Sequence, residues 1–326
     1  MTHGAGLFGH TESRNTGVVS VLVGRRSLLA AGAGVLVSTA ACGTTTRGAD
    51  VAAATTSASA TAEPWTSSRP PATAPSTPTS GPTPSGLDRG DLEAAIADYL
   101  GGRVGSYAVA VHDRRSGVVV SHGSGPREML STVKVLIAVA VLREVEQQAR
   151  WLTAEEDDLV AAMIQRSDND ATEVLTARLG QDSVEEELEE LRMHETTYRP
   201  DGAWWGWSTT TPEDLLLLVD HLVDGTTGLT EKSEEYLLTL MEGVTWAQRW
   251  GVATPPLPST LTVRTKNGWG PMADGYRTNS LGHVVGEGRD HSMAVLGRSP
   301  LGFSYGTTTV SRLAQIVNDA LEERLV

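Results

Sequence analysis

The segment from Gly43 to about Gly86 consists mainly of Thr, Ser, Ala and Pro, with very few large apolar side chains. A chain of this composition cannot bury enough apolar area to offset the conformational entropy lost on folding. We therefore predict that residues 42–87 form a disordered tether and that the folded structure is confined to residues 88–326. That length suits one domain with a continuous core, without metals or disulfides.

The residues before the tether predict export and a lipid anchor. Arg25 and Arg26 precede an apolar run that ends at Val37, which is too short to span a bilayer but fits the core of a secretory signal. The only cysteine, Cys42, follows small residues just after this run. The pattern resembles a twin-arginine, lipoprotein-type signal, in which residues 1–41 are removed and Cys42 is lipidated. The alternative is an ordinary cleaved signal with an incidental cysteine.

Composition excludes several classes of function. The formal net charge of −14 argues against a nucleic-acid partner, because phosphate backbones bind basic proteins. The same charge disfavours adsorption to anionic lipid, so attachment to the outer face of the cell membrane requires the covalent anchor at Cys42. A single cysteine excludes internal disulfides and cysteine-rich zinc sites. We expect a monomer with no metal and no cofactor.

From residue 88 onward, apolar periodicity predicts strands near both ends of the folded part and helices between them. Residues 133–142 are apolar on every face, which for a helix indicates complete burial. The pattern indicates an α+β fold, with an antiparallel sheet flanked by terminal helices plus an all-helical region, and a cleft between the two. The expected helices are 88–100, 133–142, 155–165, 171–179, 183–191, 212–223, 233–241 and 309–325, and the expected strands are 106–112, 118–121, 261–266, 276–285 and 292–296.

Lysine is rare in this chain, and its placement points to proton chemistry. Only three of the 26 basic residues are lysines, and two of them, Lys134 and Lys266, lie in short motifs with serine or glycine. An arginine stays protonated under ordinary conditions, whereas a buried lysine can release its proton. We therefore expect these two amines to take part in catalysis.

Ser131 and Lys134 form a Ser-x-x-Lys motif at the start of the apolar helix. A hydroxyl at a helix amino terminus lies where the backbone dipoles stabilise negative charge, and Lys134 projects from the same face. Burial would lower the proton affinity of its amine, so that it could act as a base toward Ser131. Taken alone, the motif is more typical of a serine that caps a helix.

Two further motifs strengthen the catalytic interpretation. Ser167-Asp168-Asn169 falls on a turn between two predicted helices, although by itself it could simply cap the second helix. Lys266-Asn267-Gly268 ends a β-branched run that we interpret as an edge strand; alone, it could be a strand terminus with a solvated lysine. Gly268 permits close approach of the backbone, and the amides of Trp269 and Ser131 could form an oxyanion hole. The three motifs occur in the order found in penicillin-interacting serine hydrolases.

From about Asp88 to its end, the chain resembles the class A β-lactamase and penicillin-binding superfamily, in particular the related lipoproteins of actinobacteria. The resemblance implies that Ser131 is the acylated nucleophile, Lys134 its base partner and Ser167 the proton relay. It also implies substrate contacts at Asn169 and in the Lys266-Asn267-Gly268-Trp269 segment, with Lys266 on the carboxylate side. The substrate would be a small molecule or a peptidoglycan stem peptide.

Three departures from the family pattern affect the predicted activity. Asn267 replaces the usual hydroxyl residue, and the 36-residue interval from Ser131 to Ser167 is short. The region before Thr209 also lacks the Glu-x-x-Leu-Asn string whose glutamate activates the deacylating water. We therefore predict an acyl-enzyme that hydrolyses β-lactams poorly. A working divergent β-lactamase and a non-catalytic protein that binds cell-wall material or a protein partner are the alternatives.

The same region contains other candidate groups. The carboxylates of Glu195, Asp201 and Glu213 lack the expected neighbours, and in place of the string stands a run with three indoles, from Trp204 to Trp207. Such a cluster could line the bottom of the cleft or contact a glycan. The simpler interpretation is that the indole rings pack in the structure and leave their N–H groups exposed.

Overall fold

The computed structural model describes residues 88–199, 203–254 and 257–322. The predicted signal sequence, Cys42 and the tether lie outside the described residues. Within the described residues, no helix combines the length and apolar character needed to cross a bilayer.

A five-stranded antiparallel sheet forms the centre of the described structure, with the strand order β2-β1-β7-β6-β5. The two ends of the folded chain meet in this sheet, because the first strand pairs with the last. β5 lies at one edge, paired to β6 from Thr262↔Val285 to Met272↔Gly275. The strands are β1 (Ser106–Asp113), β2 (Val118–His122), β5 (Thr262–Met272), β6 (Gly275–Gly286) and β7 (Arg289–Ser299).

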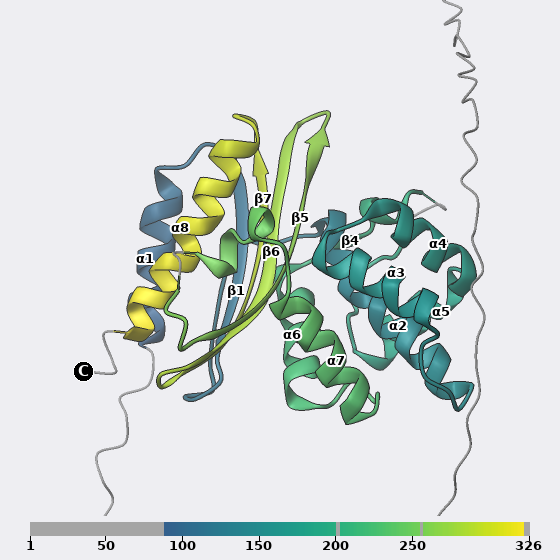
Figure 1. Cartoon of the computed structure of the whole chain (residues 1–326). Helices are drawn as coiled ribbons and strands as arrows, with labels where there is room; N and C mark the ends of the chain where they lie inside the picture. The colour runs from purple at the N-terminus through teal and green to yellow at the C-terminus, as the bar shows by residue number, and fades with distance from the viewer. Residues whose placement is uncertain (1–87, 200–202, 255–256, 323–326) are drawn as a thin grey trace, which may run out of the picture. The chain divides into compact units, whose positions relative to one another are not determined.

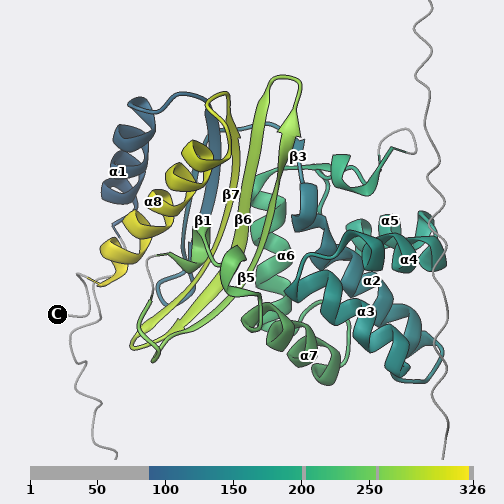
Figure 2. The same ribbon diagram turned by 45° about the horizontal axis from the view of Figure 1, so that its top comes forward.

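The terminal helices cover one face of the sheet. α1 (Arg89–Gly101) and α8 (Phe303–Glu322) lie side by side there, as Figures 1 and 2 show from two directions. α1 begins at Asp88, whose carboxylate accepts a hydrogen bond from the amide of Asp91. Apolar side chains from both helices and from the sheet form a continuous core between them.

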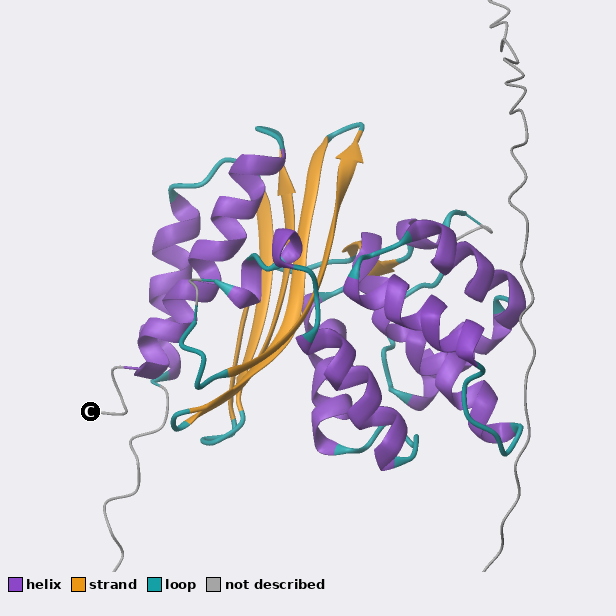
Figure 3. Cartoon of the chain, in the orientation of Figure 1, coloured by secondary structure: helices purple, strands orange, loops and turns teal. Residues whose placement is uncertain are grey.

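Helices cover the other face and extend into an all-helical region (Figure 3). α6 (Pro212–Asp224) packs on β1, β6 and β7, and α7 (Glu231–Glu242) packs on β5. α2 (Val133–Gln147) contacts α3, α4, α5 and α7, and its residues 133–142 are all buried, as its uniformly apolar sequence requires. The remaining helices are α3 (Ala154–Gln165), α4 (Asn169–Leu179) and α5 (Asp182–Glu190).

The predicted fold class is confirmed, and the differences are local. β5 continues six residues beyond Lys266, because residues 267–272 still pair with β6. α8 begins six residues earlier than predicted: Gly306, a poor helix former, brings the helix against Thr278, where an added Cβ would lie 2.6 Å from the threonine hydroxyl. A two-stranded ribbon of β3 (Arg127–Glu128) and β4 (Thr209–Thr210) was not predicted, because two-residue strands carry no periodicity.

Candidate active site

Ser131 lies on a short 3₁₀ turn, η1 (Leu130–Thr132), that leads directly into α2. The side chain of Ser131 is only partly buried, while its neighbours in the turn are buried. Leu130 has a positive φ of 50°, an unfavourable conformation for a residue other than glycine. The Thr132 hydroxyl donates to the Met129 carbonyl oxygen at 2.6 Å and stabilises this backbone path. The turn therefore holds the Ser131 hydroxyl at the accessible end of a buried helix.

Lys134 is fully buried, and its amine points at the turn between α3 and α4. Nζ donates to the Ser167 carbonyl oxygen at 2.7 Å, to Asn169 Oδ1 at 2.8 Å and to the Asp168 carbonyl oxygen at 3.2 Å, and it lies 3.3 Å from Ser167 Oγ. Among the residues that the structure describes, the Ser131 hydroxyl pairs with neither lysine. The Lys134 amine is thus hydrogen-bonded to all three residues of the second motif.

Lys266 reaches the same point from β5. Its Nζ contacts Ser167 Oγ at 3.0 Å and the Asn267 carbonyl oxygen at 3.0 Å, and its side chain is fully buried. Ser167 itself has a positive φ of 56°, and Asp168 caps α4 through the amide of Ala171. The three motifs therefore meet at one hydroxyl with an amine on each side, which we call the lysine-serine cluster (Lys134, Ser167 and Lys266).

Burial lowers the pKa of both amines. The pKa of Lys134 falls to about 7 through loss of hydration, which the nearby Asp168 carboxylate partly opposes. The pKa of Lys266 is lowered well below its ordinary value by its complete burial and by the neighbouring Lys134. Within the described part of the chain, neither amine forms an ion pair with a carboxylate. Lys134 can therefore exist as a neutral amine near neutral pH, which is the form that accepts a proton.

Gly268 brings the edge strand against the turn that carries Ser131. A Cβ added at Gly268 would lie 2.7 Å from the Met129 carbonyl oxygen and 2.8 Å from the Ser131 amide nitrogen, so only glycine fits without a backbone shift. Asn279 on β6 fixes the same turn, because its Nδ2 donates to the carbonyl oxygens of Glu128 at 2.7 Å and Met129 at 3.1 Å.

The side chains of Asn267 and Trp269 face away from the lysine-serine cluster, as strand alternation requires. Asn267 Nδ2 donates to the carbonyl oxygens of Gln248 at 2.7 Å and Trp250 at 3.0 Å, on the other face of β5. This placement departs from the expectation that the Asn267 side chain contacts substrate in the cleft. The Trp269 ring packs with Trp250, with 6.1 Å between ring centroids.

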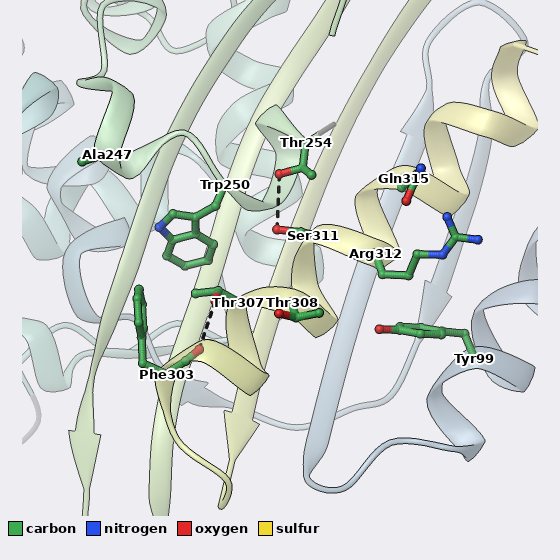
Figure 4. Close-up of a pocket in the computed structure, with 10 residues that line it drawn as sticks. All are labelled: Tyr99, Ala247, Trp250, Thr254, Phe303, Thr307, Thr308, Ser311, Arg312 and Gln315. Carbon is green, nitrogen blue, oxygen red and sulfur yellow. Dashed lines mark hydrogen bonds between the residues drawn. The ribbon is translucent and has the colours of Figure 1, made fainter. Parts of the chain in front are cut away.

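Trp250 also lines a pocket of about 480 Å³ beside α8, shown in Figure 4. Aromatic rings and hydroxyl groups surround this pocket, including Tyr99, Phe303 and Ser311. The pocket lies on the face of the sheet opposite the lysine-serine cluster. No residue of the three motifs lines it.

The indole run forms the wall of the site next to Lys134. Trp205 begins a 3₁₀ turn, η3 (Trp205–Trp207); its side chain is 1% exposed, and the Lys134 Nζ lies 4.7 Å from its ring centroid. The indole nitrogens of Trp204 and Trp205 both donate to Glu173 Oε1, at 3.1 and 2.9 Å. Trp207 is 51% exposed. The simpler interpretation, packing with exposed tips, therefore describes Trp204 and Trp207, while Trp205 borders the reactive groups.

Neither Glu195 nor Glu213 is hydrogen-bonded to the lysine-serine cluster. Glu195 and Glu213 are exposed, and Asp201 is outside the described residues. Glu173 was not singled out from the sequence, although its position four residues after Asn169 puts it on the same face of α4. Among the described residues, no cluster of His, Cys, Asp and Glu could hold a metal ion.

A family model described as the beta-lactamase enzyme family matches residues 152–321, which is more than half of the chain. The chain belongs to the beta-lactamase enzyme family. The matched segment contains Ser167, Asn169 and Lys266, and it begins after Ser131 and Lys134.

Solved β-lactamases have the same fold. A class A β-lactamase from Bacteroides cellulosilyticus is 17% identical with a TM-score of 0.63, and the alignment covers 72% of this chain and 98% of the other. A class A β-lactamase from Mycobacterium abscessus is 22% identical with a TM-score of 0.61, covering 71% and 99%. At these identities the likeness establishes the class A β-lactamase-like fold alone.

One relative by sequence is a protein of Mycobacterium tuberculosis H37Rv named "Putative lipoprotein LppW". It is 25% identical over 213 residues, which are 63% of this chain and 67% of that protein. The family and fold expected from the three motifs are thus established, and the lipoprotein expectation has a parallel in the name of a relative.

Proposed function

We propose that the protein is an exported, lipid-anchored serine hydrolase that acts through a covalent acyl-enzyme on amide or ester substrates of the cell envelope. The observation that carries this proposal is the lysine-serine cluster, in which two buried amines contact one hydroxyl beside the turn of Ser131. A buried amine with a lowered pKa is the group that a serine nucleophile needs as its base.

In this proposal Ser131 Oγ attacks the substrate carbonyl carbon, and its proton passes to the neutral amine of Lys134. Ser167 then gives a proton to the leaving nitrogen or oxygen and is reprotonated from Lys134. The two lysines keep Ser167 in place through contacts of 3.3 and 3.0 Å. The hydrogen bond between Ser131 and its base would form when substrate binds, because catalytic hydrogen bonds often tighten only in the complex.

Asn169 and Lys266 are the proposed substrate contacts of this site. Asn169 lies within hydrogen-bond distance of Lys134, so its amide can bridge the cluster and a substrate amide. A substrate carboxylate beside Lys266 would favour the protonated amine, which burial otherwise disfavours. Peptidoglycan stem peptides combine an amide with a terminal carboxylate and are the substrate class that we propose.

The proposed location follows from the amino-terminal sequence. Lipidation of Cys42 would hold the protein on the outer face of the membrane, and residues 43–86 would let the catalytic domain reach substrates at a distance from the bilayer. The name of the mycobacterial relative supports this location.

Labelling with a fluorescent penicillin followed by intact-mass measurement tests the proposed function. We expect one stable adduct on the wild-type protein, none on Ser131→Ala, and an unchanged adduct on Ser121→Ala, a control at an exposed residue of β2. Nitrocefin turnover should stay far below the usual enzyme value of about 10 per second.

Two other results would replace the proposal. Turnover at the usual enzyme rate would identify a divergent β-lactamase. The absence of an adduct with any β-lactam or fluorophosphonate, in wild type as in Ser131→Ala, would favour a binding protein without catalysis.

A further inference from the structure

The ring of Trp205 covers one side of the Lys134 amine. The two side chains are among the largest that are fully buried in the described structure, and Nζ lies 4.7 Å from the ring centroid. A cation or polarised amine over an aromatic face is favourable, but the face itself offers little to a water molecule that must be held and deprotonated. The space beside Lys134 on this side is therefore filled by an apolar group.

Several contacts fix this ring. Its Nε1 donates to Glu173 Oε1 at 2.9 Å, so the only polar atom of the indole is already engaged. The Trp204 ring lies against it with 4.2 Å between centroids, and the Trp204 indole donates to the same carboxylate oxygen. One oxygen of the Glu173 carboxylate, Oε1, thus accepts from both indoles and fixes the orientation of the Trp205 ring.

The Trp turn (residues 204–207) is also joined to the segment that precedes Ser131. η3 contacts η1, and the Met129 amide donates to the Ser208 carbonyl oxygen at 2.7 Å, next to the β3 and β4 pairing. The ring and the nucleophile are therefore positioned by the same short ribbon.

We propose that Trp205 keeps water from the Lys134 side of the acyl-enzyme and so prolongs its lifetime. The inference rests on the proposed function. Hydrolysis requires that a water oxygen bonds to the acyl carbon, that the ester bond to Ser131 Oγ breaks, and that one water proton returns to that oxygen through a base. With Trp205 in place, the amine of Lys134 cannot hold such a water on the covered side.

The test measures release of the acyl group from the full-length protein. The wild type, Trp205→Ala and Trp207→Ala are labelled with a fluorescent penicillin and chased with buffer, and the adduct is followed by intact mass. We expect Trp205→Ala to shorten the adduct lifetime by about tenfold or more, which corresponds to about 1.4 kcal/mol of barrier. Trp207→Ala removes an exposed indole of the same turn and should change the lifetime by less than about twofold.

A second variant covers the case in which Trp205→Ala fails to fold. Glu173 is an exposed helix residue whose carboxylate fixes the ring, so Glu173→Ala should fold and should also shorten the lifetime, by a smaller factor. A general loosening of the site would slow acylation, whereas the proposal expects faster release with acylation by the same probe nearly unchanged.

The outcomes separate this inference from the proposed function. Unchanged lifetimes in both Trp205→Ala and Glu173→Ala, or equal shortening in Trp207→Ala, would overturn the role of Trp205 and leave the acyl-enzyme intact. The absence of an adduct on the wild type would overturn the proposed function, and the inference with it.

Discussion

At Lys134, the loss of hydration sets the chemistry of a single residue. Its pKa of about 7 means that a large fraction of the amine is neutral at neutral pH, while the Asp168 carboxylate limits the fall. A base is most effective when its pKa lies near the working pH, because it is then both unprotonated and basic. Arginine could satisfy the same hydrogen-bond acceptors but could not give up its proton.

The rate of acylation should therefore depend on pH in a defined direction. Below about pH 7 the Lys134 amine becomes protonated, so we expect the labelling rate to fall about tenfold per pH unit, and to level off above that value. The measurement is the second-order rate of labelling by a fluorescent penicillin across this range. The Lys134 ammonium also lowers the pKa of the Lys266 amine, so the inflection is that of two neighbouring amines that titrate together.

Lys134→Arg is the matched control for this profile. Its guanidinium stays charged, so acylation should be slower by about 100-fold or more and should lose the inflection. A wild-type profile that is flat through neutral pH would contradict the role of Lys134 as the base.

At the scale of the elements, the edge strand β5 and the turn η1 are in contact through a glycine. Gly268 and Gly270 lie on the same face of β5, two residues apart. A Cβ at Gly268 meets three backbone atoms within 3.0 Å, whereas a Cβ at Gly270 meets only the side chain of Leu130, at 3.3 Å. The backbone atoms near Gly268 cannot move away from an added Cβ by a change of rotamer, whereas the Leu130 side chain near Gly270 can.

The two alanine variants should therefore differ sharply. Gly268→Ala must displace the backbone around Ser131, so we expect a loss of about 1–3 kcal/mol in the free energy of unfolding and a large loss of labelling rate. Gly270→Ala should cost less than about 1 kcal/mol, because Leu130 can adjust. Thermal unfolding and penicillin labelling measure both effects, and equal behaviour of the two variants would refute the close approach.

The sequence predicted the elements whose periodicity is long and regular, and it missed those held by pairing or packing. The all-apolar helix at 133–142 and the hairpin after Ser106 were correctly located. The extension of β5 to Met272 could not be predicted, because Asn267, Gly268 and Gly270 are poor strand formers that pair only because β6 is alongside.

The meeting of the three motifs was predictable from their order, but the surroundings of the site were not. The contact between Lys134 and Trp205 joins residues 71 positions apart through η3, for which the sequence has no regular signal. The side chain of Asn267 points away from the site because alternate residues of a strand face opposite sides of the sheet. We did not predict this orientation because we expected the strand to end near Lys266.

At the scale of the whole molecule, the proposed attachment to the membrane depends on Cys42, which lies outside the described residues. We expect the full chain, produced in a bacterium that lipidates exported proteins, to partition into the detergent phase and to carry the mass of a lipid on Cys42. Cys42→Ser should move the protein to the aqueous phase, because the acidic chain has little affinity for anionic lipid.

The matched control is Ser67→Ala, a change within the tether that leaves the cysteine in place. The Ser67→Ala protein should partition into the detergent phase, as the wild type does. A wild-type protein found in the aqueous phase, without added lipid mass, would refute the anchor and leave the proposed chemistry of the catalytic domain untouched.

The ribbon formed by β3 and β4 has a consequence for how this chain can diversify. The ribbon pairs the backbone before Ser131 with the backbone after the Trp turn. An insertion in either stretch would therefore also displace the other. Descendants of such a protein would change their chemistry most easily by exchanging individual side chains on an unaltered frame. Trp205 is one such side chain, and because it is buried, its replacement must also restore the packing that the indole provides.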